Sequence, residues 1–162
     1  MNTELSPDIQ KANRSFRGKG AVGKNAIIPK YVAELFDKTF QILDYGCGPA
    51  KIHIENLKLL GFASIDGFDF GKNWRENMQY EVKSGHYDVI YASNVVNTWS
   101  TIELSEVSLD GIHNGLKPNG IFLSNLPKTP RYLLNNSEYE KLLELNFSIR
   151  HLEANVYFCT KK

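Results

Sequence analysis

The chain has 162 residues, a formal net charge of +1 and 23% charged residues. That length fits one domain with a buried core, and so small a net charge creates no general electrostatic demand for nucleic acid. Cys47 and Cys159 are too far apart in sequence to indicate a disulfide framework or a metal site, which fits a reducing compartment. No apolar run could cross a bilayer and the N-terminus lacks the layout of a secretory signal, so we expect a cytoplasmic protein.

Residues 1–24 are predicted to form an irregular basic N-terminal arm, and residues 25–162 a single domain. Between Gln10 and Lys30 the sequence holds six Lys or Arg residues and no acid. Such a run is either a solvated arm, which is the commoner case, or a surface that faces a polyanion.

The rest of the chain alternates between predicted helices and strands. Helices are predicted where apolar residues recur every three or four positions, over 25–36, 52–60, 103–116 and 137–145. Strands are predicted over 41–45, 63–68, 87–93, 120–126, 147–153 and 155–160, with a short strand over 78–82 if one is present there. Only a turn or two of helix fits between residues 71 and 77.

Local signals mark the ends of several elements. Gly61 closes the second helix, and Lys117-Pro-Asn-Gly120 indicates a stop and turn before a strand. Ser137 with Glu140 three residues later indicates a capping box. The last two strands are too close for a crossover helix and should pair as a hairpin. The predicted fold is therefore α/β, a doubly wound and mainly parallel sheet with a C-terminal antiparallel hairpin.

The first strand runs into the turn Asp44-Tyr-Gly-Cys-Gly-Pro49, and the second strand ends at Asp69. Gly46 and Gly48 allow backbone conformations that side chains forbid, and the free amides of the next helix favour electron-rich groups. This pattern, an acid followed by two glycines and then by a second acid at the end of the next strand, resembles the first two motifs of the class I S-adenosylmethionine-dependent methyltransferases. The resemblance covers about residues 41–126, and it implies a Rossmann-like fold with S-adenosylmethionine as cofactor.

Two other ligands compete for such a turn. A dinucleotide usually requires Gly-x-Gly-x-x-Gly, but the sixth position here is Lys51. A phosphate-binding loop would need Gly-x-x-x-x-Gly-Lys-Ser/Thr, which no stretch supplies. S-adenosylmethionine carries no phosphate and needs neither pattern.

The resemblance also implies the cofactor-binding residues, which are Asp44, Gly46, Gly48, Pro49, Asp69, Phe70, Asn94 and Lys24. Asp44 would lie near the amino or sulfonium end, the glycine turn beside the adenosine, and Phe70 against the adenine. Asp69 would accept hydrogen bonds from the ribose hydroxyls. For Asp69 the structural alternative is an Asx-type turn or a helix cap.

The assignments of Asn94 and Lys24 to the cofactor site rest on shorter sequence matches. Asn94 follows the predicted strand 87–93, where the family lines the site towards the sulfonium and the acceptor; a plain turn residue is the alternative. Residues 20–29 faintly resemble a Gly-Gly-Lys segment of some DNA adenine methyltransferases, through which Lys24 could meet the cofactor carboxylate; a plain helix start explains them as well. Residues 83–86 lack the acid that holds the adenine amino group in the family.

The resemblance implies an S-adenosylmethionine-dependent methyltransferase whose acceptor is unidentified. No catalytic residue is predicted, since methyl transfer depends mostly on positioning, and the four histidines show no metal-ligand spacing. The basic arm slightly favours a nucleic-acid acceptor over a small molecule, and a partner subunit could help to hold it. The alternative is a non-catalytic or regulatory cofactor-binding domain in a complex. Asp69→Ala and Gly46→Val are expected to weaken cofactor binding more than folding.

Overall fold

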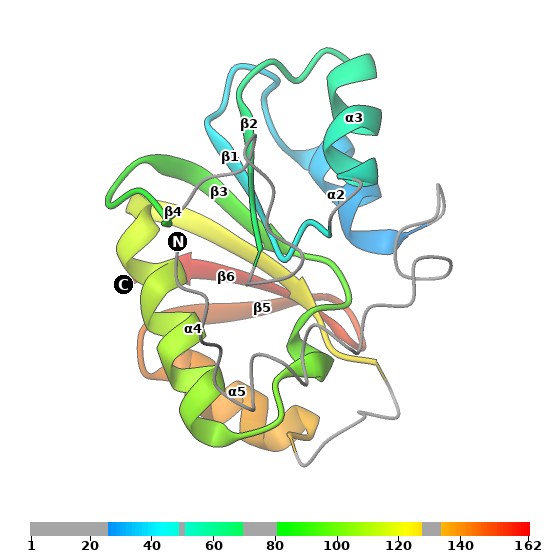
Figure 1. The fold of residues 1–162 in the computed structure, drawn as a ribbon. Coiled ribbons are helices and arrows are strands. Elements are labelled where there is room, and N and C mark those ends of the chain that lie inside the picture. The colour runs from blue at the N-terminus through cyan, green and yellow to red at the C-terminus, as the bar shows by residue number, and fades with distance from the viewer. Residues whose placement is uncertain (1–25, 49–50, 70–80, 128–133) are drawn as a thin grey trace, which may run out of the picture.

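The computed structural model, drawn in Figure 1, describes residues 26–48, 51–69, 81–127 and 134–162. Its helices are α2 (Ile27–Leu35), α3 (Ile52–Leu59), α4 (Ile102–Gly115) and α5 (Asn136–Glu144), with a short 3-10 helix, η2 (Val96–Thr98). Its strands are β1 (Ile42–Tyr45), β2 (Ile65–Phe68), β3 (Tyr87–Ala92), β4 (Leu116–Asn125), β5 (Phe147–Glu153) and β6 (Val156–Lys161). Of the predicted short strand 78–82, only Glu81 and Val82 are described, and neither is in a strand.

These strands form one sheet in the order β2-β1-β3-β4-β6-β5. Strands β2, β1, β3 and β4 pair in parallel, whereas β6 pairs antiparallel with both β4 and β5. The chain leaves β1 towards β2 and returns on the other side of β1 to form β3, so the strand order reverses between β1 and β3. The predicted doubly wound, mainly parallel sheet with a C-terminal antiparallel hairpin is confirmed.

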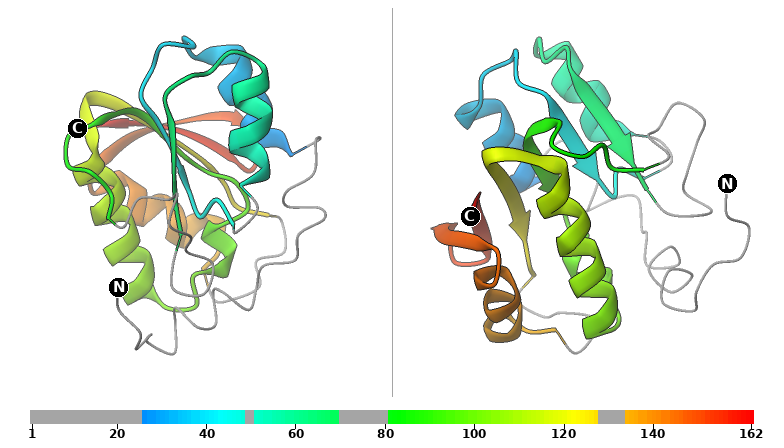
Figure 2. Two further views of the ribbon diagram at one scale, coloured as in Figure 1. Left: turned by 45° about the horizontal axis from the view of Figure 1, so that its top comes forward. Right: turned by 90° about the vertical axis from the view of Figure 1, so that its left-hand side faces the viewer.

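Helices cover both faces of the sheet. Helices α2 and α3 lie on one face, and α4 and α5 lie on the other (Figures 1 and 2). Side chains of β3 alternate between the two cores, with Val89 and Tyr91 in the core under α2 and α3, and Ile90 and Ala92 in the other. Burial on both faces explains why β3 is almost continuously apolar.

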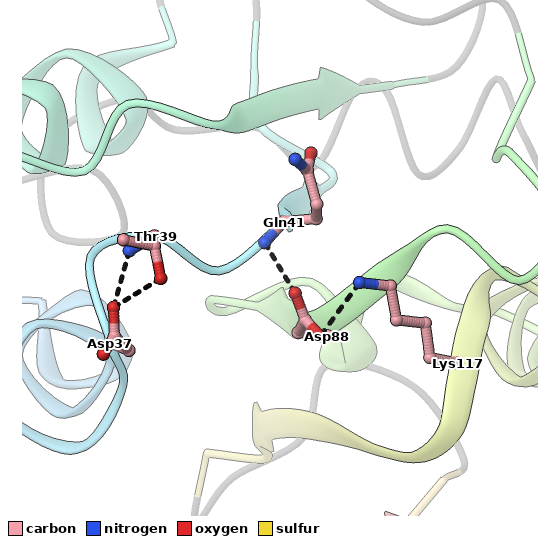
Figure 3. Close-up of polar contacts among 5 residues, drawn as sticks. All are labelled: Asp37, Thr39, Gln41, Asp88 and Lys117. Atoms are coloured by element: carbon pink, nitrogen blue, oxygen red, sulfur yellow. Dashed lines mark hydrogen bonds and ion pairs between the residues drawn. The ribbon is translucent and has the colours of Figure 1, made fainter.

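Two separate sets of polar contacts lie near the amino ends of β1, β3 and β4 (Figure 3). One carboxylate oxygen of Asp88 accepts from the Gln41 N–H at 2.8 Å, and the other accepts from Lys117 Nζ at 3.1 Å. Asp37 accepts from the N–H and hydroxyl of Thr39 at 2.8 and 2.6 Å, which closes the turn before β1. The Asp88 contacts join the amino ends of β1, β3 and β4.

Strand β4 begins earlier than predicted. Leu116 already pairs with Tyr87, and the register then shifts so that Ile121 pairs with Val89. The predicted stop and turn therefore lies inside the strand as an irregularity, where Asn119 has a left-handed backbone with φ of 62°. The irregular backbone around Asn119 was predicted from its turn residues. The pairing of Leu116 was not, because it depends on β3, which is distant in sequence.

The end of α3 matches its prediction. Gly61 has φ of 102°, and its N–H donates to the Lys58 carbonyl at 3.0 Å. The Phe62 N–H donates to the Leu57 carbonyl at 3.1 Å, which completes a Schellman motif. Glycine is suited to this position because its backbone is left-handed.

The start of α5 differs from its prediction. The capping box is formed by Asn135 and Glu138, not by Ser137 and Glu140. The Glu138 N–H donates to Asn135 Oδ1 at 2.9 Å, and the Asn135 N–H donates back to Glu138 Oε2 at 3.2 Å. The helix thus begins at Asn136, one residue before Ser137.

Replacing the observed cap is therefore expected to cost stability. Asn135→Ala should lower the free energy of unfolding by about 1 kcal/mol, because a helix N–H loses its acceptor. Ser137→Ala, at the exposed position first predicted as the cap, should change it by less than about 0.5 kcal/mol. Urea unfolding of both variants checks this, and an equal loss in both would contradict the assignment.

Candidate functional site

The glycine turn after β1 has the conformation that only glycine adopts easily. Gly46 and Gly48 have φ of 79° and 73°. The N–H groups of Gly46 and Cys47 both donate to the Phe68 carbonyl, at 2.8 and 3.1 Å, and so fasten the turn to the end of β2. Lys51, the residue before α3, also has a left-handed backbone, with φ of 50°. The turn therefore lies at the carboxyl ends of β1 and β2.

Gly46 also packs closely against the segment that follows β3. A Cβ atom added to it would lie 2.6 and 2.9 Å from the two γ-methyl groups of Val95. Because real Cβ atoms do not come so close to another heavy atom, the absence of a side chain at Gly46 is a packing requirement. The structure therefore changes the expectation for Gly46→Val, which must disturb folding strongly.

Even the smallest side chain at this position should destabilise the protein. Gly46→Ala is expected to lower the free energy of unfolding by about 2–5 kcal/mol, from backbone strain together with the Val95 clash. Gly85 is a matched control, since its φ is 56° and nothing lies within 4 Å of an added Cβ. Gly85→Ala should cost only about 1–2 kcal/mol. Equal losses by chemical denaturation would contradict a role for Val95.

Asp69 contacts the glycine turn directly. It is buried immediately after β2, and its Oδ2 accepts from the Gly48 N–H at 2.7 Å. This bond joins residues 21 positions apart in sequence, so it is neither an Asx-type turn nor a helix cap, the two structural alternatives for Asp69. An ionised carboxylate has about four acceptor sites, so this bond is compatible with others to a ligand. The structure places Asp69 beside the turn that contains Gly46 and Gly48.

Asp44 is a buried carboxyl group at the same edge. It is 1% exposed, and Oδ2 accepts from the Tyr91 hydroxyl at 2.9 Å. Burial raises the pKa of Asp44 to about 8; the Tyr91 hydrogen bond opposes the rise and the nearby Asp69 charge adds to it. Asp44 is therefore largely protonated at neutral pH, and a cation beside it would favour the ionised form.

Asn94 lies at the carboxyl end of β3, locked to a residue that sequence reasoning missed. Its N–H donates to Asn125 Oδ1 at 2.8 Å, and Asn125 Nδ2 donates to Asn94 Oδ1 at 2.7 Å. Asn94 has φ of 56°, which supports the turn role that was left open for it. Asn125 is the last residue of β4. The sequence signal that could have indicated this pair is a polar residue at the end of each of two adjacent strands. Tyr91 was missed because its contact with Asp44 depends on the pairing of β1 with β3.

Three predicted cofactor residues, Pro49, Phe70 and Lys24, lie outside the described residues. In the described segment 83–86, the His86 ring lies edge-on against Tyr87, with ring centroids 4.8 Å apart. Across the part of the chain that the structure describes, no group of three His, Cys, Asp or Glu side chains could hold a metal ion. Nor is any described helix long and apolar enough to cross a membrane.

The sequence and the structure give different results in comparisons with known proteins. No protein-family model and no curated protein matches the sequence. The structure resembles a 1,6-didemethyltoxoflavin-N1-methyltransferase of Burkholderia thailandensis, solved with 1,6-didemethyltoxoflavin and S-adenosylhomocysteine. The TM-score is 0.64 at 13% identity, covering 85% of this chain and 80% of that one.

Two further solved structures have the same architecture. The S-adenosylmethionine-bound amino pentose methyltransferase CalS10 of Micromonospora echinaspora, involved in calicheamicin biosynthesis, has a TM-score of 0.65 at 12% identity, with full coverage of both chains. The [4+2]-cyclase SpnF has a TM-score of 0.59 at 16% identity, covering 76% of this chain and 58% of that one. This chain therefore has the fold of the class I S-adenosylmethionine-dependent methyltransferases. At these identities the likeness concerns the fold alone.

Proposed function

We propose that this protein is an S-adenosylmethionine-dependent methyltransferase that acts on a small molecule. The observation that carries the proposal is the meeting of Asp44, Gly46, Gly48 and Asp69 at the carboxyl ends of β1 and β2. The strand order reverses beside them, between β1 and β3, and open α/β sheets bind their ligands at such a reversal.

The residues of this edge fit the chemical groups of the cofactor. S-adenosylmethionine, when bound, supplies a methyl group activated by a sulfonium. Asp69 would accept hydrogen bonds from the ribose hydroxyls while its Oδ2 holds the Gly48 N–H. The buried Asp44 would face the positively charged amino or sulfonium end, where a cation offsets the cost of ionising the carboxyl. Both glycines keep the backbone free of side chains beside the adenosine.

A small-molecule acceptor is supported by the structural neighbours. The structure from Burkholderia thailandensis is that of a 1,6-didemethyltoxoflavin-N1-methyltransferase, and CalS10 is an amino pentose methyltransferase. The nucleic-acid acceptor first favoured rests on the basic arm, which lies outside the described residues. A partner subunit stays a prediction. Because a [4+2]-cyclase has the same fold, methyl transfer itself has to be measured.

The test is formation of S-adenosylhomocysteine by the whole chain in the presence of acceptor panels. Amino sugars and nitrogen heterocycles form one panel, and DNA and RNA form the other. Product formation with a small molecule is expected. Methylation of nucleic acid together with a mobility shift that weakens steeply with salt would replace the small-molecule acceptor. Tight cofactor binding without product in either panel would favour the non-catalytic domain in a complex.

A further inference from the structure

The Asp44 carboxyl group is buried beside a neutral partner. It is 1% exposed, and its described hydrogen bond comes from the hydroxyl of Tyr91, which is itself fully buried. None of the ion pairs among the described residues includes Asp44. An ionised carboxylate is costly to bury without a cation, and one hydroxyl does not offset that cost. The surroundings of Asp44 therefore favour its protonated form.

A second acid lies at the same edge of the sheet. Asp44 pairs in register with Gly67 of β2, and Asp69 follows Gly67 by two residues. Asp69 is 8% exposed, and its carboxylate accepts from the Gly48 N–H. Two neighbouring carboxyl groups do not both ionise readily, and the proton stays on the group whose charge is more costly to bury. That group is Asp44, in agreement with its raised pKa.

Other titratable groups also lie on this face of the sheet. Burial raises the pKa of the Cys47 thiol and of the Tyr91 hydroxyl, so both stay neutral. The helices α2 and α3 carry the remaining groups, which are Lys30, Tyr31, Glu34, Lys51, His53, Glu55 and Lys58. Besides burial, the groups that shift the pKa of Asp44 are Tyr91 and Asp69. The proton on Asp44 is thus held by its immediate neighbours.

A cation that binds beside Asp44 would displace this proton. S-adenosylmethionine is positively charged at its sulfonium and amino groups, and the proposed function places that end at Asp44. An opposite charge within about 4–6 Å favours the ionised carboxylate. As the cation binds, the O–H bond of Asp44 breaks and the proton passes to the solvent. The Tyr91 hydroxyl donates to Oδ2 in both states and stabilises the carboxylate that remains.

We propose that binding of the cofactor expels one proton from Asp44, and that Tyr91 is the residue that positions Asp44 for this exchange. The inference rests on the proposed function and adds control by pH to it, because the cofactor site must lose a proton before it can hold a cation. Since the pKa of Asp44 is about 8, the affinity for S-adenosylmethionine should rise about tenfold from pH 6 to pH 7.

Calorimetry of the whole chain in buffers of different ionisation enthalpy counts the protons released. At pH 7, about one proton per bound S-adenosylmethionine is expected. The matched probe is 5′-methylthioadenosine, which keeps the adenosine and the sulfur but has no positive charge, and its binding should release none. Asp44→Asn should release no proton with either ligand, and its affinity for S-adenosylmethionine should stay level from pH 6 to pH 7.

Substitution of Tyr91 tests its positioning role. Tyr91→Phe removes the hydrogen bond that favours ionised Asp44, so it should weaken S-adenosylmethionine binding at pH 7 about tenfold and shift the pH profile upwards. Binding of 5′-methylthioadenosine should change less. Tyr87→Phe is the matched control, because the buried Tyr87 hydroxyl also donates to a carboxylate, that of Asp66, at 2.7 Å, and lies on the other face of β3. It should leave the affinity and its pH profile unchanged, and thermal unfolding shows whether each variant is folded.

The outcomes separate this inference from the proposed function. Binding of S-adenosylmethionine without proton release, or with the same release in Asp44→Asn, overturns the proton exchange alone. Equal affinities and pH profiles in folded Tyr91→Phe and Tyr87→Phe overturn the role of Tyr91. Failure of S-adenosylmethionine to bind to the folded protein between pH 6 and pH 8 overturns the proposed function and the proton exchange with it.

Discussion

Asp69→Asn is expected to lower the affinity for S-adenosylmethionine by at least about 100-fold while the protein stays folded. Asparagine keeps an oxygen that can accept from the Gly48 N–H, so the turn is retained. It loses the negative charge and the second carboxylate oxygen that the ribose hydroxyls require. A hydrogen bond to a charged group contributes roughly 1.5–3 kcal/mol, and about 1.4 kcal/mol corresponds to a factor of ten in affinity.

Calorimetric titration with the cofactor measures this loss, and thermal unfolding of the same samples monitors the fold. Asp69→Ala removes the Gly48 contact as well, so comparison of the two variants separates support of the turn from recognition of the ribose. Asp110→Asn, at an exposed position on α4, is the charge-matched control. If Asp69→Asn binds the cofactor within threefold of the unaltered protein, the ribose role is wrong.

Stability is expected to fall as the pH rises from about 4 to about 8, because of Asp44. Its pKa is about 8 in the folded protein and 3.8 ordinarily, so the folded state holds the proton more tightly than the unfolded state does. Stability from a raised pKa is fully present below the unfolded value and is lost as the pH passes the folded value. The loss amounts to as much as ~5 kcal/mol, since one pKa unit corresponds to 1.4 kcal/mol.

Asp44→Asn removes this titration and retains an oxygen that can accept from the Tyr91 hydroxyl. The variant should therefore be about as stable as the unaltered protein near pH 4 and increasingly more stable as the pH rises to 8. Urea unfolding across this pH range measures the free energy of unfolding of both proteins. Taking the difference between them cancels the contribution of the other titrating groups. Parallel pH profiles would show that Asp44 ionises normally in the folded state.

The architecture was largely predictable because its signals are local. The alternation of helical and strand periodicity, the glycine after α3 and the short connection between β5 and β6 each depend on neighbouring residues. The start of α5 was not predictable in the same way, because Asn135 and Ser137 both have a glutamate three residues later. Asn136 Nδ2 donates to Asn155 Oδ1 at 3.1 Å, and the Tyr157 hydroxyl donates to Asn136 Oδ1 at 2.8 Å. Asn136, the first residue of α5, is thus bonded to the β5–β6 hairpin, which is distant from it in sequence.

The candidate site also has a part that local sequence predicts and a part that depends on the strand order. The acids and glycines of the turn form one compact pattern, and the structure brings Asp44, Gly46, Gly48 and Asp69 to one edge of the sheet. The partners of these residues could not be predicted, because Tyr91, Val95 and Asn125 become neighbours only through the strand order β1-β3-β4. Polarity at the ends of parallel strands is the signal that would have indicated Asn125.

The most direct test of the cofactor site is a calorimetric titration of the whole chain with S-adenosylmethionine and, separately, with a nicotinamide dinucleotide. Saturable binding of S-adenosylmethionine at one site per chain is expected, together with its loss in Asp69→Asn and no comparable binding of the dinucleotide. Absence of S-adenosylmethionine binding by the folded protein, or tighter binding of the dinucleotide, would contradict the assignment of the Gly46–Gly48 turn.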